Sequence, residues 1–82
     1  MGIIYTDHAL LRMARRGLKI EWIERVVIAP AHKFPDAFDH SIEHCFGLIP
    51  ELDNRVLPVI VSKEEPKRVV TAYLDRKMRG KL

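Results

Sequence analysis

Two short segments at opposite ends of the chain carry residues that together could cleave RNA. His8 and Arg12 lie in the first segment, and Tyr73 and Arg76 lie in the second. An imidazole titrates near neutral pH, so it can take a proton from a ribose 2′-hydroxyl or give one to a leaving oxygen. Arginines neutralise the phosphate and the charge that grows on it in the transition state, and a tyrosine can stack on a base. We therefore take these four as candidate catalytic residues, although each type also occurs on ordinary protein surfaces.

Positive charge gathers beside both segments. Residues 67–82 carry six basic side chains against Asp75 alone, whereas residues 1–66 carry eight basic and ten acidic ones. The basic side chains nearest to the candidate catalytic residues are Arg15, Arg16, Lys77 and Arg79. Such clusters attract phosphates or an acidic protein partner. We predict that these four residues bind RNA, and the alternative is that they form a solvated helix face and a solvated tail.

Metal and cofactor chemistry is not expected. The potential metal ligands that lie close together in the sequence are His32, His40, His44 and Cys45. On a strand the last two point to opposite faces, and His40 and His44 would lie about 13 Å apart at ~3.3 Å per residue. Neither arrangement suits a tetrahedral ion, so the predicted chemistry uses no metal.

Composition indicates one globular domain over residues 1–82, because 48% of the chain is hydrophobic. The single cysteine, Cys45, excludes an internal disulfide and is typical of a reducing compartment. No apolar run approaches the ~18 residues that cross a bilayer, and the N-terminal residues lack the order of a signal peptide. We expect a cytoplasmic protein with no membrane partner.

The apolar pattern of residues 6–29 predicts two helices. Thr6 is suited to cap the first helix, which should stop at Gly17. The second should cover residues 19–29 and end before Pro30. The residues expected to face the core are Leu10, Met13 and Ala14 in the first helix, and Trp22, Ile23, Val26 and Val27 in the second.

After Pro30 the apolar period changes to two, which predicts strands joined by short loops and therefore antiparallel neighbours. The expected strands are residues 32–38, 41–49, 55–62 and 67–74, with residues 3–5 as an extended lead-in. Pro58 suggests an edge strand or a bulge. Alternation on the last strand predicts one face with Arg68, Val70, Ala72, Leu74 and Arg76, and another with Thr71, Tyr73 and Asp75. The predicted fold is α+β, with two N-terminal helices packed on a three- to four-stranded antiparallel sheet.

The same two segments carry a family resemblance. The residues concerned are Tyr5 to Ala9 with Arg12, Met13, Arg16 and Gly17, then Trp22 to Val27 with Ala29 and Pro30, and finally Val69 to Tyr73 with Asp75 to Arg79. They resemble a bacterial domain-of-unknown-function family whose layout is similar to that of the RelE/ParE and BrnT toxins. The resemblance implies a RelE-like fold, cleavage of mRNA without a metal or other cofactor, and neutralisation by a partner antitoxin. His8 and Arg12 match the opening motif, and Tyr73 and Arg76 match the closing one.

Three hypotheses follow for the function. The first is a metal-independent RNA endonuclease toxin, which would act on RNA, ribosome-bound or free, and bind a cognate antitoxin. The second is a non-catalytic nucleic-acid-binding module of the same fold. The third is a protein-interaction module whose basic tail docks an acidic partner. The sequence leaves open whether the protein forms a homodimer.

Overall fold

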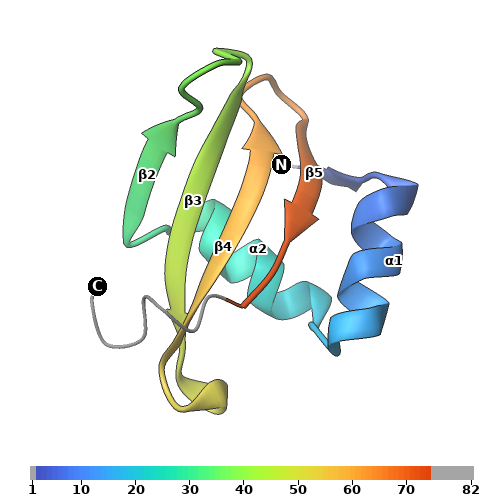
Figure 1. Ribbon diagram of the computed structural model, residues 1–82, viewed down its shortest axis with the longest axis vertical. Coiled ribbons are helices and arrows are strands. Elements are labelled where there is room, and N and C mark those ends of the chain that lie inside the picture. Colours follow the sequence, from blue (N-terminus) through green and yellow to red (C-terminus); the bar gives the residue numbers. More distant parts are fainter. Residues whose placement is uncertain (1, 75–82) are drawn as a thin grey trace.

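A five-stranded sheet with two helices makes up the computed structural model, which describes residues 2–74 (Figure 1). The elements follow the chain in the order β1 (Ile3–Tyr5), α1 (Asp7–Arg16), α2 (Ile20–Ile28), β2 (His32–Pro35), β3 (Ile42–Ile49), a 3-10 helix (Pro50–Leu52), β4 (Arg55–Ser62) and β5 (Lys67–Ala72). The structure thus confirms the predicted α+β class and both N-terminal helices. None of the helices within residues 2–74 is long and apolar enough to cross a membrane.

The sheet has five strands rather than three or four, in the order β1-β5-β4-β3-β2. The additional strand is β1, the predicted extended lead-in, and it pairs in parallel with β5 while all other pairs are antiparallel. The backbone of Thr6 continues this pairing by donating to the carbonyl of Val69, which is 63 residues away in the sequence. Strand β1 has only three residues and is not joined to β5 by a short turn. The sequence pattern therefore gave no sign of the pairing between them.

Local capping interactions place α1 where the sequence predicts it. The side chain of Thr6 accepts a hydrogen bond from the backbone N–H of Ala9 at 3.0 Å, which satisfies one of the unpaired donors of the first turn. Gly17 ends the helix in the left-handed conformation with a φ of 66°, which glycine adopts without steric cost. The bounds of α1 are therefore set by residues at its two ends.

The buried face of α1 is narrower than predicted. Ala9 and Met13 are buried, one turn apart, whereas Leu10 is 43% exposed and Ala14 is exposed. The reason is the position of the helix, which lies beside β5 near the edge of the sheet and packs mainly against that strand (Figure 1). A helix that packs against one strand buries a narrow stripe of residues four positions apart, here Ala9 and Met13. The prediction that Leu10 and Ala14 also face the core is therefore wrong.

The core lies between α2 and the middle of the sheet. Trp22, Ile23, Val26 and Val27 are buried, as predicted, and α2 contacts β3 and β4 (Figure 1). Gly47 on β3 lies under this helix, where an added Cβ would be 2.8 Å from Cγ2 of Val26. The close approach of α2 to β3 therefore depends on a residue without a side chain.

Pro58 was predicted to lie on an edge strand or at a bulge; it lies on a central strand, so the edge position is wrong, and the bulge in the pairing of β4 with β5 lies at Val70 instead. The carbonyl of Pro58 accepts from the N–H of Tyr73, which places the proline nitrogen on the same, β5-facing side of the strand. Because β5 ends at Ala72, the missing N–H of Pro58 falls where the ladder stops. An antiparallel pair of this kind normally exchanges two hydrogen bonds, so Pro58 leaves only the one from Tyr73, at the point where the ladder ends.

A bulge in β5 changes which of its residues share a face. Val61 pairs with Val69 and Ile60 pairs with Thr71, so Val70 lies between the two pairs. Both Val69 and Ala72 are consequently buried in the core. The predicted common face is therefore wrong for Arg68, which is exposed, while Thr71 still lies on the opposite face from Ala72. The bulge interrupts the strict alternation on which the prediction depended.

We predict that Gly47→Ala destabilises the protein by about 1–3 kcal/mol, the usual range for overpacking a well-filled core. The new methyl group would collide with the branched side chain of Val26, whose position is fixed by its own helix. Urea denaturation followed by circular dichroism measures the change. The double variant Gly47→Ala/Val26→Ala is the control, because it restores the space. If it lost as much stability as the two single variants added together, this explanation would be wrong.

Candidate functional site

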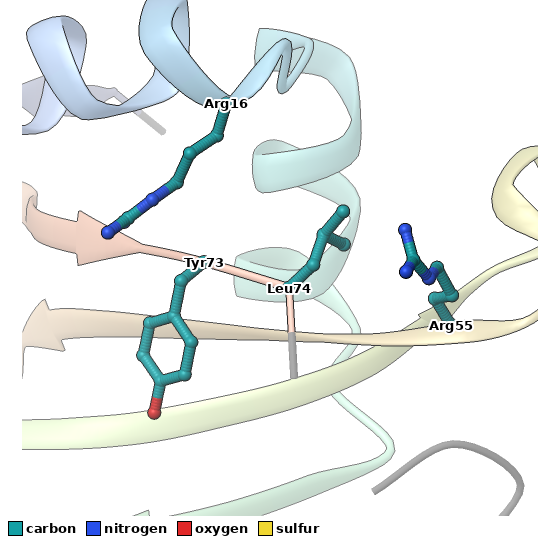
Figure 2. Close-up of a pocket in the computed structure, with 4 residues that line it drawn as sticks. All are labelled: Arg16, Arg55, Tyr73 and Leu74. Atoms are coloured by element: carbon teal, nitrogen blue, oxygen red, sulfur yellow. The ribbon is translucent and has the colours of Figure 1, made fainter. Parts of the chain in front are cut away.

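An open cavity of about 470 Å³ lies where the chain leaves β5. Within residues 2–74 it is lined by Arg16, Arg55, Tyr73 and Leu74 (Figure 2). Arg16 comes from the last turn of α1 and Arg55 begins β4, while the other two residues directly follow β5. The cavity therefore brings together three segments that are far apart in the sequence.

Arg16 is held in place by the uncovered edge of β5. Strand β1 accompanies β5 only as far as Val69, so the following residues of β5 have no strand on that side. The N–H of Tyr73 points to Pro58 on β4, and because a trans peptide places its C=O opposite its N–H, the carbonyl of Ala72 points to the uncovered edge. Arg16 Nη1 donates to this carbonyl at 2.8 Å. One side chain thus takes the place of the missing strand and is positioned in doing so.

The guanidinium of Arg16 carries five N–H groups in a planar fork, and within residues 2–74 its one side-chain hydrogen bond is that to Ala72. This leaves room for a ligand such as a phosphate, which accepts two parallel hydrogen bonds from such a fork. The hydrogen bond to the Ala72 carbonyl holds the guanidinium of Arg16 at the edge of β5. Arg16 is therefore both a structural and a potential binding residue.

Arg55 supplies a second guanidinium from the far side of the cavity. It follows Asp53 and Asn54, both of which have a φ of 58°, and its backbone pairs with Ile49 at the end of β3. The turn therefore places Arg55 at the first position of β4. Its side chain is half-buried and has no hydrogen bond or ion pair with another residue of the described part of the chain.

The described lining suits an anion with an attached ring. It contains two guanidinium groups and a phenol but no carboxylate. Tyr73 points away from Arg16, and its ring extends toward β4, to which its backbone is hydrogen-bonded (Figure 2). A phosphate between the arginines would therefore lie on the helix side of the sheet, and the Tyr73 ring would be reached by a base that continues past the end of β5.

The cavity unites two residues that were predicted from opposite ends of the sequence, namely Arg16 and Tyr73. His8 is exposed in the first turn of α1, and eight residues of helix place it about 12 Å along the axis from Arg16. Arg12 is half-buried and Arg15 is exposed, and neither lines the described cavity. The other predicted residues, Arg76, Lys77 and Arg79, lie outside the residues that the structure describes.

Arg55 is the residue that the sequence did not suggest. It belongs to neither of the two motif-bearing segments, and its neighbours along the chain are turn residues and an apolar strand. Only the pairing of β4 with β5 brings the start of one strand to the end of the other. The residue pattern of β4 alone does not show that its first residue lies near the end of β5.

The potential metal ligands are dispersed in the structure. Among residues 2–74, no group of three or more histidine, cysteine or acidic side chains could hold a metal ion. Cys45 is buried in the core, where burial raises the pKa of its thiol, while His44 on the opposite face bonds Asp36 at 2.8 Å. His44 and Cys45 therefore point to opposite faces of β3, as predicted.

Comparison with protein families finds one match, a family described as Domain of unknown function (DUF4258), over residues 5–74. The chain belongs to the DUF4258 family. No curated protein and no solved structure matches it. The DUF4258 match includes all four described residues of the cavity, so the cavity is formed within the family domain itself.

We predict that Arg55→Ala weakens the binding of inorganic pyrophosphate about 10- to 150-fold, since a hydrogen bond to a charged group contributes roughly 1.5–3 kcal/mol. The stability of the fold should hardly change, because the Arg55 side chain has no bond to the described residues. Isothermal titration calorimetry at low salt measures the affinity. Lys63→Ala removes an equal charge from an exposed residue directly after β4 and is the matched control. An equal loss of pyrophosphate affinity in the two variants would show that binding depends only on the net charge of the protein.

Proposed function

We propose that this protein is a metal-independent RNA endonuclease, the toxin of a toxin–antitoxin pair, which binds single-stranded RNA at the cavity between Arg16 and Tyr73. The observation that carries the proposal is the meeting of Arg16, Arg55 and Tyr73 around one cavity. A phosphodiester with its flanking base needs this combination of cations and an aromatic ring.

The reaction would be an internal transfer at phosphorus. The ribose 2′-oxygen attacks the adjacent phosphorus, and the bond from phosphorus to the 5′-oxygen breaks. The products are a 2′,3′-cyclic phosphate and a 5′-hydroxyl end. The proton of the 2′-hydroxyl passes to a base, and the leaving 5′-oxygen gains a proton, so neither an oxidant nor a cofactor is consumed.

Three of the four described residues of the cavity have a role in this scheme. Arg16 and Arg55 would hold the phosphate from two sides and stabilise the charge that grows on it. Tyr73 would position the flanking base, or transfer a proton through its hydroxyl. His8 was predicted to exchange protons, and because it lies about 12 Å along the helix from Arg16, we treat its contribution as a separate question for experiment.

The partner proposed for the cell is an antitoxin with an acidic surface. The resemblance of the chain's two ends to a toxin-like layout suggests it, and the described lining carries cations without carboxylates. An acidic segment seated over Arg16 and Arg55 would be attracted by charge and would exclude RNA. Inhibition and binding would then compete for the same residues.

A second candidate function, a non-catalytic nucleic-acid-binding module, is favoured by one observation. The lining described within residues 2–74 includes neither a histidine nor a carboxylate that could act as a general base. Such a module would bind RNA with a steep dependence on salt but leave it intact. Cleavage products distinguish the two functions directly.

The decisive experiment combines purified protein with a single-stranded RNA in buffer containing EDTA. We expect cleavage to products that end in a 2′,3′-cyclic phosphate, identified by mass spectrometry. Arg16→Lys should lower the rate about 10²-fold, since the loss of one preorganised donor to a developing oxyanion typically costs 10²–10³. Tyr73→Phe, which keeps the ring, separates a proton-transferring role from stacking, and His8→Ala measures the histidine's contribution.

The same variants are induced in bacterial cells, where growth and the positions of new mRNA ends are recorded. Lys63→Ala is again the control, and it should cleave and inhibit growth as the wild type does. Harmless expression together with intact RNA in the test tube would refute the endonuclease. Salt-sensitive binding of that intact RNA would instead establish the binding module.

A further inference from the structure

The face of the sheet opposite the helices carries a line of ring-bearing side chains that begins at the cavity. Tyr73 lies beside Pro58 on β4, because its N–H bonds the Pro58 carbonyl. Pro58 is paired with Phe46 on β3, and Phe46 is paired with His32 on β2. Since strands are spaced by ~4.8 Å, the line crosses about 14 Å of the sheet.

These residues share the open face because directly paired residues point the same way. Their neighbours along β3 and β4, Cys45 and Val59, belong to the core beneath the helices. Alternation therefore places Phe46 and Pro58 on the side away from α2. The line is thus separate from the packing that holds the domain together.

The rings at the β2 end contact one another and are accessible. His32 and Phe34 stack, with their centroids 6.1 Å apart and an angle of 10° between planes. Phe34 also meets Phe46 edge to face at 5.8 Å. Phe34 is 53% exposed and all four residues of β2 are exposed, while Phe46 and Tyr73 are half-buried and Pro58 is buried. We call His32, Phe34, Phe46 and Tyr73 the aromatic row.

A hydrogen bond between His44 and Asp36 holds the β2 end of the aromatic row in place. His44 Nε2 lies 2.8 Å from an oxygen of Asp36, and the other oxygen of Asp36 accepts from the backbone of Phe38 and Asp39. The hydrogen bond with His44 is the main cause that lowers the pKa of Asp36 to about 2. The loop after β2 is therefore tied to β3 by a carboxylate that stays ionised at neutral pH.

We propose that the aromatic row is a base-stacking subsite for single-stranded RNA whose phosphate lies in the cavity. This inference rests on the proposed function and names where the rest of the substrate binds. The exposed rings of His32 and Phe34 would stack on bases, and the half-buried Phe46 and Tyr73 would border the strand on its way from the cavity. Exposed aromatic rings next to cations are how sequence-tolerant sites hold single strands, because every base has a π-face.

The neighbouring edge of β2 argues against a protein strand as the occupant. Lys33 and Pro35 lie on this short edge strand, and a charge and a proline at an edge both hinder pairing with another chain. The arginines at the other end of the row instead provide attraction for phosphates. The bases of a duplex are already stacked, so the row selects single strands.

The test measures the binding of 2′-O-methyl RNA, which resists attack by its own 2′-oxygen, as a dinucleotide and as an octanucleotide. We expect the octanucleotide to bind more tightly to the wild type. Phe34→Ala should weaken the octanucleotide roughly 5- to 150-fold, the range for loss of one base–aromatic stack. It should leave the dinucleotide unchanged, since that fills only the cavity. Fluorescence anisotropy and competition give both affinities.

Two further variants identify stacking as the cause. Phe34→Leu should lose octanucleotide affinity as Phe34→Ala does, because it stays apolar but has no ring, while Phe34→Trp should retain it. Leu11→Ala is the control for a loss of exposed apolar surface, since Leu11 is 51% exposed on α1. Retention of affinity by Phe34→Leu, or an equal loss in Leu11→Ala, would contradict stacking on the row.

The outcomes for the row and for the proposed function are distinguishable. If the dinucleotide binds and loses affinity in Arg16→Lys, but the octanucleotide is no tighter or is indifferent to Phe34, the aromatic row is refuted alone. If the wild type binds neither RNA, the cavity and the row are refuted together. A duplex that binds as tightly as the single strand and depends equally on Phe34 would also overturn the row.

Discussion

The hydrogen bond from Arg16 to the carbonyl of Ala72 connects the fold of this protein to its candidate site. It exists because β1 is only three residues long and leaves the end of β5 uncovered. A longer β1 would satisfy the carbonyl of Ala72 by backbone pairing and would occupy the space that Arg16 now enters. The length of one short strand therefore determines whether the last turn of α1 can present a guanidinium beside Tyr73.

The same geometry explains why the two motif-bearing ends of the sequence belong together. Strand β1 pairs with β5, and α1 follows β1 directly, so the first and last described elements lie side by side (Figure 1). The cavity forms at the end of this contact, where β4 contributes Arg55. The open face then continues from Tyr73 across the sheet to Phe34. The cation pair and the set of rings thus lie on the two sides of the sheet and adjoin where Tyr73 and Leu74 follow β5.

Local features of this fold could be predicted from the sequence, whereas features that depend on distant pairing could not. The Thr6 cap, the Gly17 stop and the buried side of α2 each follow from a few consecutive residues. The parallel β1–β5 pair and the bulge at Val70 depend on the meeting of separate segments. The candidate site divides in the same way, because Arg16 and Tyr73 lie in motif segments and Arg55 is brought to them only by the sheet.

We propose RNA binding at the cavity formed by Arg16, Arg55 and Tyr73. Its most direct measurement is an NMR titration of the isotope-labelled protein with a short 2′-O-methyl RNA, observing the arginine Nε–H and backbone amide signals. We expect the largest chemical-shift changes at the Nε–H groups of Arg16 and Arg55 and at the backbone amide of Tyr73. Shifts confined to the exposed side of the helices, or no shifts at RNA concentrations that saturate other RNA-binding domains, would contradict it.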